Sequence, residues 1–247
     1  MKRRLLAAAL GAVYALALIA TAPATLLDSR LRDASDGRLR LAEARGTLWS
    51  GSGQLEIRDE RGRTGLAKPV AWHFRPAGLL RARLSYEVAL DPGSRPFQVA
   101  LHGSRIELVD ADIGLPASAL GHLVPKLATL GLSGDLTLQV PQLSFGRGAT
   151  HGSATVHWRD AGSGLSPVAP LGNYELRVSG DGPTVRTALT TLQGPLQLDG
   201  QGVWATGRPP EFVASARVPS EFHPRLAPFL RLISVERTDG SFEFRLQ

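Results

Sequence analysis

The sequence of 247 residues contains no cysteine, and this absence excludes several kinds of site. Disulfides, cysteine nucleophiles, thiolate zinc sites and iron–sulfur clusters all require cysteine. A chain of this length can still fold on its hydrophobic core, so the composition remains compatible with export from the cytoplasm. Lysine is also scarce: it occurs only at Lys2, Lys68 and Lys126, and the other basic residues are arginines.

The excess of basic over acidic residues is small when the N-terminal residues 2–4 are left out of the count. The formal net charge is +6, but without Lys2, Arg3 and Arg4 the chain has 25 basic residues against 22 acidic ones. The arginines stand singly among acidic residues, whereas a nucleic-acid binder concentrates them in a stripe or a helix. We therefore expect a solvated surface and no nucleic-acid partner. The 43% of hydrophobic residues and 20% of charged residues are ordinary for a globular protein.

The sequence also lacks the motifs that carry catalysis. The segment Trp49-Ser50-Gly51-Ser52-Gly53 has the composition of a hydrolase elbow but not its G-x-S-x-G spacing, and we interpret it as a turn between strands. Asp110 and Asp112 are interpreted as a solvated turn. No phosphate-binding glycine motif occurs, and no two histidines have zinc-ligand spacing. The six histidines are His73, His102, His122, His151, His157 and His223. We predict that the protein is not an enzyme and has no catalytic residue, metal site or cofactor.

The N-terminus predicts a membrane anchor. The cationic residues 1–4 are followed by an uncharged stretch, residues 5–27, which is long enough to span a bilayer as a helix. The positive-inside rule places residues 1–4 in the cytoplasm and residues 28–247 in the periplasm. The alternative is a cleaved signal peptide, with Ala20-Thr21-Ala22 or Ala22-Pro23-Ala24 as the cleavage signal. Pro23 makes the first of these a poor site, so we favour the uncleaved anchor in the inner membrane.

Apolar residues alternate with polar ones along most of the remaining chain, which predicts strands with one buried face. Glycines and prolines separate these runs, as turns require. Because buried parallel strands would give continuous apolar runs, the pattern favours an antiparallel one-faced sheet. The protein is therefore expected to be mainly β. The apolar positions of the runs are Leu55 and Ile57; Leu84, Tyr86, Val88 and Leu90; Ile106 and Leu108; Leu136, Leu138 and Val140; Tyr174, Leu176 and Val178; Leu196 and Leu198; and Phe242, Phe244 and Leu246.

Two segments have helical spacing and indicate short helices that close the sheet. Residues 116–130 contain Pro125, and residues 220–233 contain Pro228, so each helix should be short or kinked. A shift of 103 residues superimposes the prolines and leucines of the two segments. We therefore predict two similar halves, residues 38–140 and 141–247, although common leucines and prolines could give the same match by chance.

Several motifs, in their order along the chain, resemble the protein N component of the bacterial type II secretion system (the GspN family). They follow the anchor and cover nearly the whole chain. Each motif alone is weak, because Leu-Trp-x-Gly and Leu-x-Gly turns are common in exported β-rich proteins. The motifs are Gly46-Thr47-Leu48-Trp49-Ser50-Gly51-Ser52-Gly53, the strand ending at Trp72, Ala169-Pro170-Leu171-Gly172-Asn173-Tyr174, residues 191–200 with Gly202 and Trp204, and residues 222–246.

The resemblance implies a single-pass inner-membrane subunit that supports export of folded proteins across the outer membrane. Its partners would be the inner membrane and other type II secretion subunits, and the family provides no catalytic residues. Similar turns and strands also occur in AsmA-like periplasmic groove proteins, which are linked to lipid movement. A lipid-binding groove is therefore the alternative function. An apolar sheet face that stays open would require a lipid or a protein partner to cover it.

Overall fold

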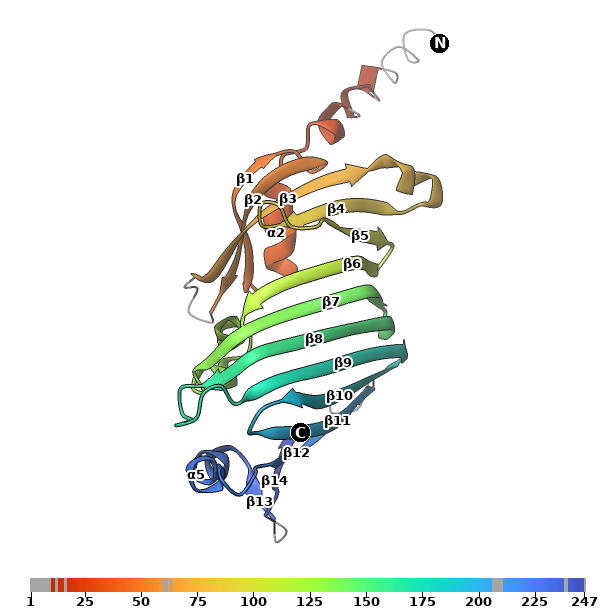
Figure 1. The fold of residues 1–247 in the computed structure, drawn as a ribbon. Helices are drawn as coiled ribbons and strands as arrows, with labels where there is room; N and C mark the ends of the chain where they lie inside the picture. Colours follow the sequence, from red (N-terminus) through yellow and green to blue (C-terminus); the bar gives the residue numbers. More distant parts are fainter. Residues whose placement is uncertain are drawn as a thin grey trace. The chain divides into compact units, whose positions relative to one another are not determined.

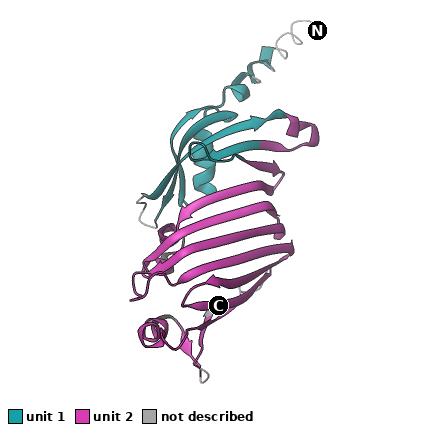
Figure 2. Cartoon of the chain, viewed as in Figure 1, with its two compact units in different colours: residues 1–76, 86–96 teal, residues 77–85, 97–247 magenta. Residues whose placement is uncertain are grey.

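The computed structural model describes residues 10–11, 13–15, 17–59, 62, 64–205, 211–237 and 240–246. It divides into two compact units (Figure 2): unit 1 contains residues 1–76 and 86–96, and unit 2 contains residues 77–85 and 97–247. Strands make up 58% of the chain, and every strand pair for which a register is given is antiparallel. The prediction of a mainly β protein with an open antiparallel sheet is confirmed.

Unit 1 is a helix followed by strands in sequence order (Figure 1). Its elements are α2 (Thr25–Ala34), β1 (Leu39–Gly46), β2 (Ser50–Arg58), β3 (Thr64–Arg75) and most of β4 (Leu84–Leu90). The core forms where Ala24, just before α2, and Leu27 and Leu31 of α2 pack against Leu41 of β1 and Trp72 of β3. Ala24 is only 1% exposed, which shows how closely the start of the helix approaches the sheet.

Unit 2 contains the larger sheet, with strand order β5-β6-β7-β8-β9-β10-β11-β12-β14-β13. The strands are β5 (Phe97–His102), β6 (Arg105–Pro116), β7 (Leu132–Gly146), β8 (Ala149–Ser163), β9 (Gly172–Gly182), β10 (Thr184–Gln193), β11 (Gln197–Ala205), β12 (Glu211–Arg217), β13 (Val235–Glu236) and β14 (Phe242–Leu246). The helical segments are η1 (Pro76–Arg81), η2 (Ala117–Ala119), α3 (Leu120–Leu123), α4 (Pro125–Ala128) and α5 (His223–Ile233).

β-Bulges keep the apolar residues of the long strands on one face. Asp110 in β6 and Asp160 in β8 have positive φ values of 55° and 48°. The pairing of β8 with β9 shifts between Trp158 and Ala161, whereas β6 keeps one register with β7 across Asp110. A bulge adds one residue, so alternation restarts on the same face after it. Trp158 before the bulge in β8 and Ala161 after it therefore share a face. The alternation predicted from the sequence is real, and the acidic residues mark where it is interrupted.

The helix predicted over residues 116–130 is divided into three short pieces. Val124 is extended, with φ −127° and ψ 97°, and α4 begins at the next residue, Pro125. A residue before proline avoids the helical region because it would clash with the proline ring. The helix predicted over residues 220–233 is found as α5, which continues through Pro228. Both are short, as expected, but only the first is broken by its proline.

One glycine-rich segment differs from the expectation. The segment Ser50-Gly51-Ser52-Gly53 was expected to be a turn, but it is the start of β2. Gly51 is needed for close approach, because a Cβ there would lie 2.3 Å from the carbonyl oxygen of Arg45 and 2.5 Å from the Trp72 ring. The two similar halves, residues 38–140 and 141–247, stay a prediction; residues 140–141 lie within β7, and the compact units divide the chain between residues 76 and 97.

The end of the predicted anchor contacts unit 1. Residues 17–20 are helical, Pro23 pairs with Thr47, and α2 begins at Thr25, so residues 23–27 belong to the folded unit. Trp49 donates an indole hydrogen bond to the Ile19 carbonyl at 2.7 Å. Within the part of the chain that the structure describes, no helix has the length and apolarity needed to span a bilayer. Residues 1–9, 12 and 16 of the predicted cytoplasmic and anchor segments lie outside that part.

Candidate partner-binding surfaces

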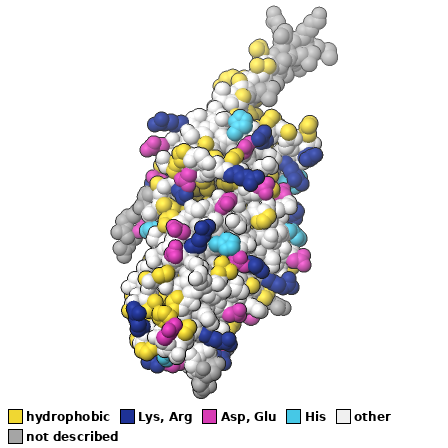
Figure 3. Space-filling model, in the orientation of Figure 1, with side chains coloured by type: hydrophobic (Ala, Val, Ile, Leu, Met, Phe, Trp, Pro, Cys, Tyr) yellow, Lys and Arg dark blue, Asp and Glu magenta, His cyan; other side chains and the backbone are white. Residues whose placement is uncertain are grey.

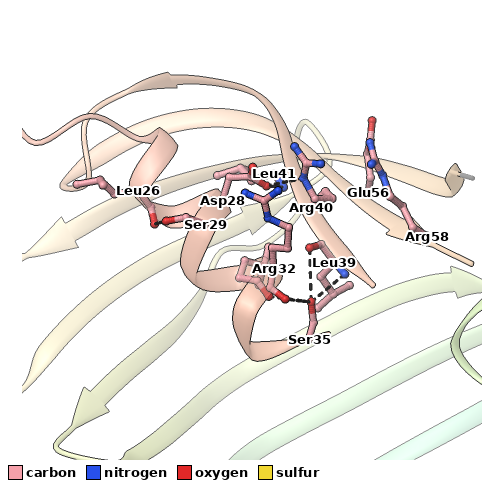
Figure 4. A network of polar contacts seen from close by, with 11 residues as sticks. Leu26, Asp28, Ser29, Arg32, Ser35, Leu39, Arg40, Leu41, Glu56 and Arg58 are labelled. Atoms are coloured by element: carbon pink, nitrogen blue, oxygen red, sulfur yellow. Dashed lines mark hydrogen bonds and ion pairs between the residues drawn. The ribbon is translucent and has the colours of Figure 1, made fainter. Parts of the chain in front are cut away.

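The first edge of the unit 1 sheet, strand β1, is closed by side chains of α2 (Figure 4). The Asp28 carboxylate accepts hydrogen bonds from the Leu41 backbone N–H at 2.8 Å and from the Arg40 guanidinium at 3.0 Å. The Ser35 hydroxyl oxygen accepts a bond from the Leu39 backbone N–H at 2.9 Å. Two N–H groups on the outer side of β1 are thus occupied. An edge strand whose donors are satisfied in this way is a poor template for another strand.

The charge state of Asp28 supports this arrangement. Partial burial of the carboxyl raises its pKa, but the hydrogen bonds from Arg40 and the Leu41 backbone, with the attraction of Arg40 and Arg32, outweigh burial and hold the pKa below its ordinary value. Asp28 is therefore ionised at neutral pH and acts only as an acceptor. Glu43 adds a second obstacle at this edge, because its φ of 51° and the pairing shift between Ala42 and Arg45 interrupt β1.

The opposite edge of the unit 2 sheet is open. β13 pairs only with Phe242 and Glu243 of β14, so the outer side of residues 244–246 faces no other described strand. Leu232 on α5 and Val235 on β13 are 72% and 71% exposed. Unpaired N–H and C=O groups beside exposed apolar side chains are the features that accept a strand from another protein. We call β13, β14, Leu232 and Val235 the C-terminal edge.

One end of the apolar face of unit 2 is covered by helices. α5 packs Leu226 and Leu230 against Phe242 of β14 and Leu196, and these side chains are almost completely buried. Tyr174 on β9 is buried beside this cluster, and its hydroxyl donates a hydrogen bond to the Leu196 carbonyl at 2.9 Å. Burial raises the pKa of the Tyr174 hydroxyl, so it remains a protonated donor at every physiological pH. This end of the face is a packed core.

The other end of the apolar face is not covered to the same extent. One row of paired residues crosses six strands, in the order Leu108, Leu143, Gly152, Gly180, Val185 and Trp204. The two glycines contribute no side chain to the middle of the row. Trp204 is 42% exposed, and Phe145 in the neighbouring row is 38% exposed. We call this region the open apolar end, and its exposed aromatic side chains make it a candidate contact surface.

The polar face carries small charge networks. His157 lies 3.7 Å from the Glu175 carboxylate, which is paired with Arg177 at 2.6 Å. Glu107 likewise accepts a hydrogen bond from Gln142 and pairs with Arg83. On the molecular face drawn in Figure 3, basic and acidic side chains are interspersed. This distribution fits the expected solvated surface.

The structure places the candidate chemical residues apart. His73, His102 and His151 are exposed on separate strands, and His122 and His223 lie in helices. Among the residues that the structure describes, only His157 lies within 4 Å of a carboxylate. Asp110 and Asp112 are in strand β6, not in the solvated turn expected from the sequence, and Asp110 has a positive φ. Among the described residues, no group of three histidine or acidic side chains is arranged to hold a metal ion.

Comparison with known proteins gives one match. The sequence model of the family described as type II secretion system (T2SS), protein N matches residues 37–245. The chain belongs to this family. No curated protein and no solved structure matches it. The protein N family is a component of a secretion system and not an enzyme family.

The family match includes parts of both units, and residues 37–245 contain strand β1, the open apolar end and the C-terminal edge up to residue 245. Asp28 and Ser35, which close the β1 edge, precede the matched residues. Sequence reasoning anticipated the apolar face, because alternation marks it directly. It missed the closing of β1 by Asp28, which looked only like the polar residue that ends the anchor. No pattern in the sequence indicates that its carboxylate reaches a backbone 13 residues away.

Proposed function

We propose that this protein is an accessory inner-membrane subunit of the type II secretion system, which binds another subunit through the C-terminal edge. By this contact it supports export of folded proteins from the periplasm across the outer membrane. Family membership supports the secretion role. The cationic residues 1–4 and the uncharged residues 5–27 support the location, with the N-terminus in the cytoplasm and residues 28–247 in the periplasm.

The observation that carries the binding site is the difference between the two terminal edges. Asp28 and Ser35 occupy the outer donors of β1, whereas β14 leaves residues 244–246 without an outer neighbour among the described strands. A partner strand would add its backbone hydrogen bonds to β14, and its side chains would contact Leu232 and Val235. The predicted anchor concentrates the protein at the membrane, which raises the effective concentration of the two partners.

The proposed role is binding and not turnover. The histidines and acidic residues are dispersed over the described sheet, and the motifs of phosphate binding, acyl transfer and zinc hydrolysis are missing from the sequence. The surfaces that stand out are an unpaired strand edge and exposed apolar side chains. These surfaces serve association.

In vivo photo-crosslinking tests this proposal. A photo-reactive amino acid at Val235 should crosslink to the periplasmic part of another secretion subunit. The same amino acid at Arg38, an exposed position just before β1, should not crosslink. Deleting the gene should reduce release of folded exoproteins without affecting their passage across the inner membrane. Equal crosslinking at both positions, or none at Val235 in secreting cells, would contradict the assignment of the edge.

The lipid-binding alternative has one observation in its favour, the open apolar end with Phe145 and Trp204. Acyl chains could cover this surface as well as a protein could. If they do, the full chain purified in detergent should retain phospholipid in stoichiometric amount, and deleting the gene should weaken the outer membrane. Replacing Phe145 and Trp204 by serine should then remove the lipid. Under the secretion proposal, the lipid content should not depend on these two side chains.

A further inference from the structure

The connection between β3 and β4 forms an ordered tip that displays two leucines to solvent. Leu80 is 92% exposed and Leu79 is 54% exposed, the first being the most exposed of the large apolar side chains that the structure describes. The tip comprises η1 and the residues up to Leu84, which is itself exposed. We call residues 76–84 the β3–β4 tip. Two adjacent exposed leucines at a turn are costly to leave in water, so their position requires an explanation.

The backbone of the tip holds these leucines in place. The Ala82 N–H donates to the Leu79 carbonyl at 2.9 Å, and the Arg83 N–H donates to the Gly78 carbonyl at 3.0 Å. Gly78 allows this tight closure, because a Cβ there would lie 2.5 Å from the Ser85 hydroxyl oxygen. The leucines are therefore presented by a defined turn, and a collapse that buries them would break these bonds.

The charges around the leucines have one sign. Arg81 and Arg83 lie within the tip, Arg75 precedes it, and the sequence has no acidic residue from position 61 to position 86. Arg83 contacts Glu107 at 3.3 Å and Arg75 pairs with Glu87, so part of this charge is compensated. Arg81 is exposed and forms no ion pair with any residue that the structure describes. Exposed leucines flanked by arginine match the interface of an anionic bilayer, where apolar groups enter the acyl region and cations remain at the phosphates.

The tip also follows the strand end that contacts the N-terminal helix. The Phe74 backbone N–H donates to the Trp49 carbonyl at 2.6 Å, and the two rings are 4.9 Å apart. The Trp49 indole donates a hydrogen bond to the carbonyl of Ile19, a residue within the predicted anchor. Pro76, the first residue of η1, comes two residues after Phe74. Unit 1 thus extends to Pro76, and residues 77–84 of the tip belong to unit 2.

We propose that the β3–β4 tip rests on the periplasmic surface of the inner membrane, with Leu79 and Leu80 among the acyl chains and Arg81 at the anionic headgroups. This second contact rests on the proposed location of the protein at that membrane. This second, peripheral contact would add to the attachment of the protein to the membrane that the predicted anchor provides.

The absence of cysteine makes a direct test possible, because a single introduced cysteine can be labelled uniquely. The full chain is placed in nanodiscs of phosphatidylcholine with phosphatidylglycerol, with an environment-sensitive dye on Ala77→Cys at the tip or on Val13→Cys in the anchor. Spin-labelled lipid then quenches any dye that touches the bilayer. Quenching at both positions is expected. In the Ala77→Cys background, Leu79→Ser with Leu80→Ser should reduce the quenching about twofold or more, because insertion scales with buried apolar area.

Matched control variants distinguish an effect of the tip leucines from the effect of removing exposed leucines anywhere on the protein. Leu165 and Leu192 are also exposed leucines, and changing both to serine should leave the quenching at Ala77→Cys unchanged. Arg81→Glu should reduce it only when phosphatidylglycerol is present. Quenching of Val13→Cys without quenching of Ala77→Cys would overturn the tip proposal and leave the anchor intact. Quenching at neither position would overturn both, and quenching at Ala77→Cys alone would support the tip while rejecting the anchor.

Discussion

Asp28 and Leu41 are 13 residues apart, and the carboxylate of the first accepts the backbone N–H of the second at 2.8 Å. This bond joins helix α2, which begins at Thr25, to β1, the outer strand of unit 1. Because Leu41 would otherwise offer an unpaired donor at a sheet edge, the bond both attaches the helix and closes the edge. The proposed binding role of the opposite, open edge depends on this difference.

Replacing Asp28 by alanine should destabilise unit 1. A hydrogen bond to a charged group contributes about 1.5–3 kcal/mol, so Asp28→Ala should lower the free energy of unfolding by roughly 1–3 kcal/mol. Asp28→Asn should cost less, because its side-chain oxygen can still accept the Leu41 N–H. Urea unfolding followed by tryptophan fluorescence would measure the change. Asp33→Ala, an exposed position on the same helix, serves as the control and should have almost no effect.

The stabilisation by Asp28 should depend on pH in a defined direction. The pKa of Asp28 is lowered in the folded state, so the ionised form is favoured by folding. This contribution is complete above the ordinary aspartate pKa of about 3.9 and is lost as the pH falls through the lower, folded-state pKa. The difference in stability between the wild type and Asp28→Asn should therefore shrink below about pH 4. A constant difference down to pH 2 would contradict the assigned interaction.

Neighbouring leucines on α5 should respond very differently to truncation. Leu230 is fully buried against Phe242 and Leu196, so Leu230→Ala should cost about 2–5 kcal/mol of stability. Leu232 is exposed at the C-terminal edge, so Leu232→Ala should change stability by no more than about 0.5 kcal/mol. The second variant should instead weaken crosslinking from Val235. Thermal unfolding and crosslink yield, measured on both variants, distinguish packing from partner binding.

Much of the fold follows from the sequence because a one-faced sheet imprints a period of two on its strands. The bulge at Asp160 could not be anticipated in the same way, since a single extra residue in a strand looks like a lapse in alternation. The two short helices were expected, but their different response to proline was not: Val124 is extended before Pro125, whereas α5 continues through Pro228. The open edge could not be inferred, because pairing partners are set by tertiary folding.

The predicted internal repeat gains one structural parallel. The Trp72 indole donates to the Thr47 carbonyl, and the Trp158 indole donates to the Ser133 carbonyl, each across 25 residues. These two pairs are related by a shift of 86 residues, whereas the helical segments match at a shift of 103. A simple duplication would give one shift. The two similar halves therefore remain a prediction. The tryptophan pairs and the helical segments both support it, but they match at different sequence shifts.

Alanine at His157 should leave secretion nearly intact. This histidine has a carboxylate within 4 Å, the usual first requirement for a general base, so it is the strongest test of the non-enzymatic prediction. Glu175 keeps its ion pair with Arg177 when the ring is removed, so little stability should be lost. Release of an exoprotein into the medium is the measurement. A variant that accumulates normally but does not support secretion would indicate an active site.

Trp49→Phe should loosen the attachment of the N-terminal helix without unfolding unit 1. The variant keeps an aromatic ring for contact with Phe74 but loses the bond to the Ile19 carbonyl. Hydrogen exchange at the Leu48 and Ala24 amides should accelerate, because these donate to the adjoining Ala22 and Gly46 carbonyls. The expected loss of global stability is about 1 kcal/mol or less. Trp204→Phe, on the open apolar end, should leave both amides unchanged.

The membrane topology is the last prediction, and the folded start of unit 1 sharpens it. A reporter active only in the periplasm should be active when fused after Gln247, and the mature chain should begin near Met1. Cleavage after Ala22 would begin the chain at Pro23, within the segment that pairs with Thr47, and cleavage after Ala24 would remove a residue that is 1% exposed in the unit 1 core. Burial of Ala24 therefore favours retention of the segment. N-terminal sequencing of the membrane fraction decides between the two: a start at Pro23 or Thr25 would rule out the anchor, and an inactive fusion would rule out the orientation.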